Sequence, residues 1–380
     1  MRIAHLSDTH LGFRAFSRTH PSGLNFREVD VMKTFEAVLQ DILLHQPDLV
    51  IHSGDLFHVV RPSNNTITQA FRLLNGFQYE RRYRPFVLCG GNHDTPKTAD
   101  MGNIQKLFAG IDGVRFVGNL SERLSIPDLD CEVLCIPSNS LVAREEVALR
   151  PMLCHRHSVL TVHGMARQAL PKQADAGTAD FDVDDLHTDM FTYTALGDYH
   201  VHTPYAENCC FSGSTDYTTT NIWEEVGTPK GWVLFDTDRG ELQHMAVPCR
   251  PAIDLEALDA EALSIDAIHE AMRASAEGLE GLPIVRQRII NVHPSDRARL
   301  MNMPLLKELG AKCLNYQIKT TPPTVDKGDG TITPTATGKS LEDLWREHAM
   351  GVKCPNGSTT NFLVGCGLEL LKEVAEREAA

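Results

Sequence analysis

The stretch "RIAHLSDTHLG" at residues 2–12 decides the fold, because it is an apolar run that ends in a polar, Gly-containing turn. Similar runs recur as "DLVIHSGDLFH" (48–58), "RPFVLCGGNHD" (84–94), "SVLTVHG" (158–164) and "YTALGDYHVH" (193–202). Between the first three, apolar residues recur at helical spacing over about 28–45 and 65–79. Strands that alternate with helices in this way predict an α/β layered fold.

The later sequence changes character. The runs "GWVLFDTD" (231–238) and "LQHMAVP" (242–248) have no helix between them and are predicted to be antiparallel strands. Beyond about 250 we expect a helix over about 258–275, a strand at 284–293, another helix and a strand at 313–320, which together predict a small α+β unit. A Thr/Pro/Gly-rich linker and two short helical segments, 340–350 and 362–376, follow. We therefore expect three parts, 1–250, 251–320 and 321–380.

Composition is that of a folded globular protein, with 42% hydrophobic and 23% charged residues. The first residues lack the pattern of a signal peptide, and no apolar run is long enough for a membrane helix. The ten cysteines are dispersed without a CxxC pair, which is typical of reduced thiols. We expect a cytoplasmic protein that has no contact with a membrane.

The net charge of -14 argues against binding nucleic acid by bulk charge, since such proteins usually carry a basic surplus. A nucleic-acid role would then depend on local patches or on metal ions. The best basic patch is "YERRYRP" (79–85), which a solvated loop before a strand explains equally well. The candidate DNA-contacting residues are Arg14, Arg61, Arg81, Arg82 and Arg84.

Polar side chains of one chemical kind follow five of the predicted strands. In an open α/β sheet the carboxyl ends of the strands face one crevice, so residues far apart in sequence converge there. Carboxylate, imidazole and amide donors without thiolate favour Mn, Fe or Zn in a catalytic site. The residues are Asp8, His10, Asp55, His58, Asn92, His93, Asp94, His163, Asp198, His200 and His202.

Two metal ions are favoured over one, because these donors exceed what a single open ion accepts. Asp55 has two carboxylate oxygens and could bridge ions about 3.5 to 4 Å apart. Such a pair polarises a phosphate ester and activates a water molecule, so phosphoester hydrolysis is the expected reaction. His93 is placed to act as general acid on the leaving oxygen or to stabilise charge on the phosphorus centre, and Asp94 could fix the tautomer of His93 through a hydrogen bond.

The motifs "SDTHLG" (7–12), "SGDLFH" (53–58) and "GGNHD" (90–94), with a lone histidine and a final histidine motif, resemble those of the calcineurin-like metallophosphoesterases. They are closest to the SbcD-type nucleases of DNA double-strand-break repair, and His58 carries that distinction. The resemblance implies a layered sandwich of two mixed sheets flanked by helices, with a small α+β capping domain. It also implies a manganese-dependent DNA nuclease, with 3′ to 5′ exonuclease and single-strand endonuclease activity, that forms a homodimer and binds an SbcC-type SMC-like ATPase.

By the same resemblance, each of two ions has four protein ligands. One ion is held by Asp8, His10, Asp55 and the last ligand of the fifth motif. The other is held by Asp55, Asn92, His163 and the first ligand of that motif. His93 would be the catalytic acid, and His58 would contact the phosphate or position the substrate.

The fifth motif departs from the family pattern GHxH, because the gap-free match is Gly197-Asp198-Tyr199-His200. Alternate residues of an extended segment lie about 6.6 Å apart, so Asp198 and His202 would be about 13 Å apart, too far for one metal pair. His200 therefore pairs with Asp198 or with His202. We favour Asp198, because it needs no insertion and a carboxylate is an acceptable ligand for Mn or Fe.

Two other functions compete with the DNA nuclease. A small-molecule phosphoesterase would use the same metals, and the acidic net charge favours it mildly. The cap-like unit, His58 and the arginine cluster argue against it. A scaffold without catalysis is the third hypothesis, and the nearly complete ligand set argues against that one.

Overall fold

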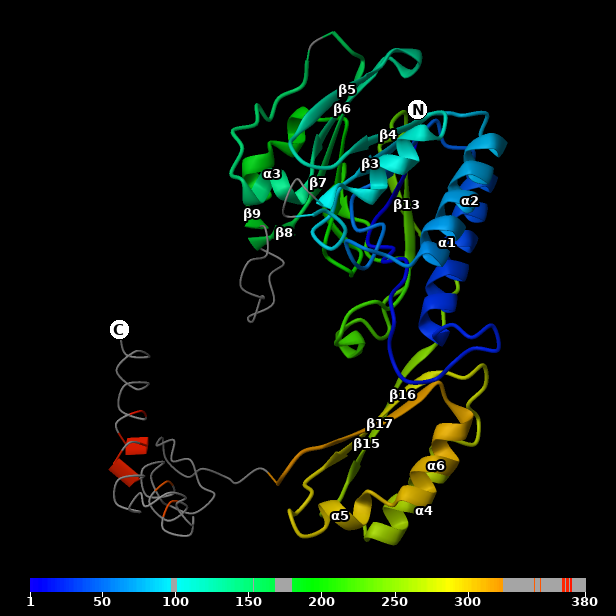
Figure 1. Ribbon diagram of the computed structural model, residues 1–380, viewed down its shortest axis with the longest axis vertical. Coiled ribbons are helices and arrows are strands. Elements are labelled where there is room, and N and C mark those ends of the chain that lie inside the picture. The colour runs from blue at the N-terminus through cyan, green and yellow to red at the C-terminus, as the bar shows by residue number, and fades with distance from the viewer. Residues whose placement is uncertain are drawn as a thin grey trace. The chain divides into compact units, whose positions relative to one another are not determined.

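A computed structural model describes residues 1–96, 101–152, 154–167 and 180–323, with single residues at 345, 349, 364, 365, 367, 368 and 370. Contacts divide the chain into two units, Met1–Pro323 and Thr324–Ala380 (Figure 1). The predicted linker lies outside the described residues. Most residues of the two helical segments expected after the linker, 340–350 and 362–376, also lie outside the described residues, and the few that are described are helical. The domain boundary expected near residue 250 stays a prediction.

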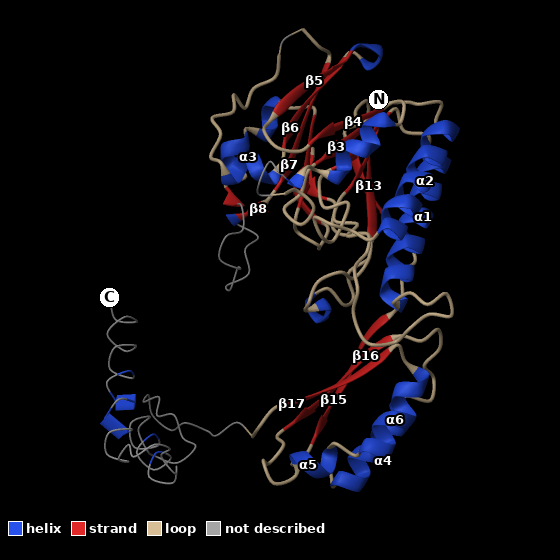
Figure 2. Ribbon diagram, in the orientation of Figure 1, coloured by secondary structure: helices blue, strands red, loops and turns tan. Residues whose placement is uncertain are grey.

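One six-stranded sheet has the order β14-β13-β1-β2-β3-β4. Figure 2 labels three of its strands, β3, β4 and β13. Strands β1 to β4 are parallel, and β13 and β14 are antiparallel as the sequence predicted. The carboxyl ends of β1, β2 and β3 therefore lie at the same edge of this sheet. Its strands are β1 (Arg2–Leu6), β2 (Leu49–His52), β3 (Phe86–Cys89), β4 (Val114–Val117), β13 (Gly231–Asp236) and β14 (Glu241–Ala246).

The second six-stranded sheet has the order β11-β12-β10-β7-β6-β5. Strands β6, β7, β10 and β12 are parallel, with β5 and β11 antiparallel at the two edges. Its strands are β5 (Glu122–Ile126), β6 (Cys131–Ile136), β7 (His157–His163), β10 (Tyr193–Gly197), β11 (Thr203–Ala206) and β12 (Cys209–Phe211). A separate pair consists of β8 (Met165–Ala166) and β9 (Asp180–Phe181).

The two sheets pack face to face as a sandwich. Ile3 and Ile51 of the first sheet share a buried cluster with Val133 and Val159 of the second. Helices α1 (Phe26–His45) and α2 (Asn64–Glu80) cover the other face of the first sheet, where the two predicted helices were expected (Figure 1). The short α3 (Ser138–Val142) follows β6. The predicted α/β class, with two mixed sheets flanked by helices, is confirmed.

The third sheet is all parallel, in the order β15-β16-β17, with helices packed on one face. Its elements are β15 (Ala252–Asp259), α4 (Ile265–Ser275), β16 (Ile284–Ile290), α5 (Arg297–Leu300), α6 (Met303–Lys312) and β17 (Asn315–Thr320). The helix predicted over 258–275 was wrong at its start, because β15 continues to Asp259. Ser264 caps α4 by accepting a hydrogen bond from the Ala267 N–H, which fixes where that helix begins.

Within the part of the chain that the structure describes, no helix combines the length and the apolar character needed to cross a bilayer.

Candidate metal centre

The turns that follow β1 and β2 run side by side, held by backbone hydrogen bonds. The Asp8 N–H donates to the Gly54 carbonyl at 3.0 Å, and the His10 N–H donates to the Asp55 carbonyl at 3.0 Å. Asp8, His10 and Asp55 all have left-handed backbone, with φ of 52°, 45° and 57°. Such conformations are costly for residues other than glycine and often mark functional sites. The turns thus hold these three side chains toward one point.

Two glycines of the strand-end motifs leave room for this arrangement. A Cβ on Gly91 would lie 2.0 Å from Asp55 Oδ1. A Cβ on Gly54, which has φ of 103°, would lie 2.1 Å from His163 Nδ1. Both glycines are needed because the backbone passes directly beside a candidate ligand.

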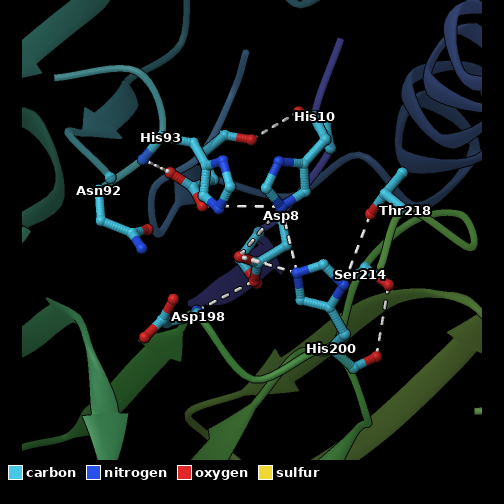
Figure 3. Close-up of polar contacts among 12 residues, drawn as sticks. Asp8, His10, Asn92, His93, Asp198, His200, Ser214 and Thr218 are labelled. Atoms are coloured by element: carbon cyan, nitrogen blue, oxygen red, sulfur yellow. Dashed lines mark hydrogen bonds and ion pairs between the residues drawn. The ribbon is translucent and has the colours of Figure 1, made fainter. Parts of the chain in front are cut away.

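Side chains from four strand ends converge, as Figure 3 shows for several of them. His10 Nε2 and His163 Nε2 lie 3.6 and 3.5 Å from Asp55 Oδ2. His200 Nε2 lies 3.8 Å from Asp8 Oδ1 and 3.1 Å from His10 Nε2. Asp8 and Asp55 are at most 1% exposed. The expected convergence of the first two motifs with His163 and His200 is therefore present.

His163 joins the remaining donors to this group. Its Nε2 lies 3.0 Å from Asn92 Oδ1 and 3.7 Å from Asp198 Oδ1. Its Nδ1 lies 2.7 Å from the Ser53 carbonyl, which can only accept a hydrogen bond. Nδ1 therefore carries a proton. Burial lowers the pKa of His163, but the neighbouring carboxylates, Asp55 above all, raise it well above 6.5, so a metal ion must displace the Nε2 proton before it can use that lone pair.

The donor set fits divalent metal ions. Asp8 Oδ1 and Asp55 Oδ2 are buried and have no hydrogen-bond partner in the described structure, although each lies within 4 Å of imidazole nitrogens. Leaving such oxygens unpaired is costly unless a cation compensates them. Ligand atoms of Asp8, His10 and His200 lie within 4.8 Å of one another, and so do those of Asp8, Asp55 and His163. Carboxylate, imidazole and amide donors suit Mn, Fe or Zn.

Burial sets the protonation of these ligands. It lowers the pKa of His10 to about 3 and that of His200 well below its usual value, so both rings are neutral. Burial raises the pKa of Asp8 to about 7, against the opposing effect of His163. For Asp55, burial acts in the same direction, but His163, His10 and His93 together outweigh burial and hold the pKa of Asp55 well below the usual range. A cation at this point would favour the ionised form of both carboxylates.

The two candidates for the fifth motif face different surroundings. The Asp198 carboxylate faces His163, and its backbone N–H donates to Asp8 Oδ2 at 3.1 Å. His202 Nδ1 instead lies 2.9 Å from the Phe211 carbonyl, and its ring stacks on that of His244, with centroids 4.5 Å apart. The structure thus gathers Asp198 and His200, and not His202, with the other candidate ligands.

His93 lies beside this group. Its backbone N–H donates to Asp55 Oδ1 at 2.9 Å, and its ring stacks on His58 with centroids 5.3 Å apart. Its Nδ1 lies 3.1 Å from the His58 carbonyl. The predicted hydrogen bond from Asp94 to the His93 ring was wrong. The Asp94 carboxylate accepts from the backbone N–H groups of Gly91 and Phe57, so Asp94 shapes the turn instead.

The arginine cluster is not beside the centre. Residues 81–84 precede β3, whereas the candidate ligands follow the carboxyl ends of the strands. The cluster therefore lies at the amino-terminal ends of the strands, on the opposite side of the sheet from the candidate ligands. Arg81 is 6% exposed and donates to backbone carbonyls, among them that of Pro47, so its prediction as a DNA contact was wrong. Arg82 and Arg84 are exposed at that distant edge, and Arg84 lies 4.0 Å from Asp48.

Of the other predicted contacts, Arg14 lies near the centre. It lines a cavity of about 710 Å³ together with His10, His58 and His93. Its side chain is 60% exposed, and its Nε donates to the buried Glu28 at 2.8 Å. Arg61 is exposed a few residues beyond His58.

Residues 212–230 contribute a group that the sequence did not predict. Thr218 Oγ1 and Glu225 Oε1 lie 3.5 and 3.9 Å from His200 Nδ1, and Lys230 Nζ donates to the His200 carbonyl at 2.8 Å. Most of these residues lie in turns, outside the strand-end pattern that identified the ligands. The sequence contained no signal for them.

Comparison with known proteins supports the resemblance drawn from the motifs. Residues 1–220 match the family of calcineurin-like phosphoesterases. The chain is 29% identical over 200 residues to a DNA double-strand break repair protein Mre11 of Sulfurisphaera tokodaii, covering 52% of this chain and 49% of that protein. It is 24% identical over 279 residues to the Mre11 of Methanocaldococcus jannaschii, covering 68% and 70%.

A bacterial relative is similar over a comparable length. The SbcD component of the nuclease SbcCD of Staphylococcus saprophyticus is 22% identical over 284 residues, covering 68% of this chain and 72% of that protein. The matches to the Sulfurisphaera and Saccharolobus proteins span about half the length of each relative, 49% and 50%.

Proposed function

The chain belongs to the calcineurin-like phosphoesterase family, and from this premise we propose that it is a metal-dependent DNA nuclease that processes ends in double-strand-break repair. The proposed reaction is two-metal hydrolysis of phosphodiesters, as a 3′ to 5′ exonuclease and single-strand endonuclease. One observation carries the proposal: the unpaired, buried Asp8 Oδ1 and Asp55 Oδ2 among converging imidazoles. The names of the relatives, a double-strand break repair protein and a component of a nuclease, support the substrate.

We propose that two manganese ions bind here, with Asp55 shared. Asp8, His10 and His200 would hold one ion together with Asp55, in keeping with the clustering of their ligand atoms. Asp55, Asn92, His163 and Asp198 would hold the second ion, in keeping with the contacts of His163 to the other three. When bound, such ions polarise phosphate oxygens and lower the pKa of a coordinated water.

The protein's own groups then handle the leaving group. His93 donates a proton to the leaving oxygen, and the hydrogen bond between its Nδ1 and the His58 carbonyl keeps the ring aimed. His58 stacks on His93 and lines the same cavity, where it positions the phosphate. Arg14 is the cation in this cavity best placed to contact the DNA backbone, and the exposed Arg61, three positions after His58, is a further candidate contact.

Partners follow from the relatives. The name of the Staphylococcus relative describes one component of the SbcCD complex, so we propose an SbcC-type SMC-like ATPase as the partner, together with a homodimer of this chain. We propose the segment 362–376, most of which lies outside the described residues, as the one that docks this partner. We propose the cytoplasm as the compartment.

A small-molecule phosphodiesterase or phosphatase is the second candidate. The net charge of -14 favours it, and so does the position of the arginine cluster at the sheet edge opposite the centre. Both functions use the same centre and differ in whether the cavity accepts a polynucleotide.

One assay separates the two functions. Purified protein is incubated with Mn²⁺ and labelled linear or hairpin DNA, and in parallel with bis(p-nitrophenyl) phosphate, with and without chelator. The nuclease proposal predicts chelator-sensitive degradation of DNA and a loss of about 10²- to 10⁴-fold in rate for His93→Asn, the usual contribution of a general acid. Hydrolysis of the small diester without degradation of DNA would reject the nuclease in favour of the alternative.

A further inference from the structure

A buried ion pair lies behind His200, on the side away from the other candidate ligands. Glu225 and Lys230 are only 4% and 3% exposed. Lys230 Nζ donates to Glu225 Oε2, to the His200 carbonyl at 2.8 Å and to Ser214 Oγ at 2.9 Å. The Ser214 N–H donates to the same carbonyl at 3.1 Å, and Ser214 Oγ lies 3.4 Å from it (Figure 3). Lys230 and Ser214 therefore hold the backbone of His200.

The other half of the pair faces the imidazole ring. Glu225 Oε1 accepts a hydrogen bond from Thr219 Oγ1 and lies 3.9 Å from His200 Nδ1. Thr218 Oγ1 lies 3.5 Å from the same nitrogen (Figure 3). His200 Nε2, at the opposite side of the ring, lies 3.8 Å from Asp8 Oδ1. The ring thus has acceptors behind it and candidate ligands in front of it.

His200 needs such support because no strand holds it. Strand β10 ends at Gly197 and β11 begins at Thr203, so His200 lies in the connection between them. Asp198, at the start of this connection, has φ of 99°. A side chain in a connection of this kind keeps one orientation only if contacts from elsewhere fix it.

An ion pair buried this deeply is weak evidence of a purely stabilising role. Removing two charges from water costs about as much as their attraction returns, and apolar replacements of similar volume are often neutral or stabilising. A carboxylate behind a metal-binding histidine has a recognised use, since it fixes the tautomer and the orientation of the ring. The placement of Glu225 behind Nδ1 matches that use.

We infer that the Glu225–Lys230 pair positions His200 for metal binding. Lys230 holds the backbone carbonyl of His200. Thr218 Oγ1 lies at hydrogen-bond distance from Nδ1, 3.5 Å, and the charge of the Glu225 carboxylate, 3.9 Å away, favours the proton on that nitrogen, so that Nε2 faces the ion. Glu225 and Lys230 are positioning residues, because they act through His200. The inference rests on the proposed metal site. It assigns a positioning role to two residues that lie outside the strand-end motifs.

The test is calorimetric titration of the metal-free full chain with Mn²⁺, without DNA. Glu225→Gln keeps the volume and an acceptor for Thr219 but removes the charge. We expect one of the two bound ions to lose about 10- to 100-fold in affinity, with the other unchanged. The double variant Glu225→Gln/Lys230→Met removes both charges and leaves neither unpaired, so it should fold, which thermal unfolding monitors. We expect its affinity to be equally weak.

The matched control is Glu132→Gln. Glu132 is a 2% exposed carboxylate on β6 that accepts from Arg123 Nη1 at 3.3 Å, with no contact to the centre. This variant should bind both ions as the wild type does.

Two results for the variants would reject the inference alone. If Glu225→Gln binds both ions normally, or if the double variant recovers normal affinity, the pair serves only to stabilise the fold. A wild-type protein that binds no Mn²⁺ would overturn this inference and the proposed function together. Normal Mn²⁺ binding without cleavage of DNA would reject only the proposed nuclease.

Discussion

At the scale of single residues, Asp198 and His202 lie two positions on either side of His200 and differ in what they face. Asp198 faces His163, whereas His202 stacks on His244 and bonds to the Phe211 carbonyl. We therefore expect Asp198→Ala to lower the stoichiometry of bound Mn²⁺ or its affinity by at least about tenfold, and His202→Ala to leave both unchanged. Metal analysis after dialysis measures the difference. The reverse pattern would reject Asp198 as a ligand.

Gly91 is a second residue whose role can be tested. A Cβ there would lie 2.0 Å from Asp55 Oδ1 and 2.3 Å from Asp55 N, which a real side chain does not tolerate. We expect Gly91→Ala to displace Asp55, abolish tight Mn²⁺ binding and destabilise the fold by about 1–3 kcal/mol. Calorimetric titration and urea unfolding measure the two effects.

Gly76 provides the matched control for that substitution. It lies in α2, is exposed and has no atom within 4 Å of a Cβ added there. Gly76→Ala should keep metal binding and stabilise the protein by about 0.5–1 kcal/mol, because alanine favours a helix. Normal metal binding by Gly91→Ala would show that the turn has more freedom than this packing implies.

Single residues also show what the sequence could predict. Asp8, His10, Asp55, Asn92 and His163 could be selected as candidate ligands because each lies at the end of an apolar strand or just after it. The hydrogen-bond partner of a polar side chain was harder to predict, because it depends on how a turn folds back. The Asp94 carboxylate, for example, binds two backbone N–H groups and not the His93 ring. The role of Glu225 depends on a loop that returns to His200, which no local pattern specifies.

At the scale of elements, the apolar runs predicted the strands reliably, and within a strand the side chains alternate between the two faces of the sheet. In β1, Ile3 faces the second sheet, while Ala4 and Leu6 face the helices, so one short strand contributes to two cores. The helix predicted from residue 258 began too early, because Leu258 fits a helical spacing as well as it fits the strand where it packs. Short apolar stretches leave this choice to tertiary contacts.

Strand β1 also carries a pH-dependent contribution to stability. His5 is fully buried, and its Nδ1 lies 2.8 Å from the Tyr193 hydroxyl of β10, on the opposite sheet. Burial lowers the pKa of His5 from 6.5 to about 3, with His202 and His52 acting in the same direction. Above pH 6.5 the ring is neutral in both states. As the pH falls toward 3, only the unfolded state gains the proton, so folding stability is lost across that window.

The expected effect follows from these two pKa values. Between neutral pH and about pH 5, the titration of His5 should lower the free energy of unfolding of the wild type by about 2 kcal/mol. His5→Gln should not show this part of the decrease. Urea unfolding of both proteins in the presence of chelator measures the difference, since every other titrating group is common to them. Equal acid sensitivity of the two proteins would show that His5 is not protonated on unfolding.

At the scale of the whole Met1–Pro323 unit, the third sheet is tied to the sandwich by specific contacts. Arg250 donates through Nε and Nη2 to Asp30 of α1, at 2.6 and 2.7 Å, and through Nη1 to the carbonyls of Gly281 and Leu282. An apolar cluster that includes Ile284 and Leu314 of this part packs against Tyr217 and Ile222. The cavity at the candidate metal centre is therefore walled by both parts, since Ile284 and Gln317 line it beside His10.

Because both parts wall the cavity, we expect the Arg250–Asp30 contact to affect the hydrolysis of long substrates more than that of short ones. Arg250→Gln removes the link to Asp30, which keeps its partner Arg27 at 3.1 Å, so the fold should persist. We expect kcat/KM on DNA to fall about fivefold, equivalent to about 1 kcal/mol, while hydrolysis of bis(p-nitrophenyl) phosphate is unchanged, because a small diester needs only the metal centre. The exposed pair Arg239–Glu241 provides the control, and Glu241→Gln should alter neither rate. An equal loss on both substrates would mean that Arg250 supports the centre itself and not the cavity wall that the proposed DNA substrate would contact.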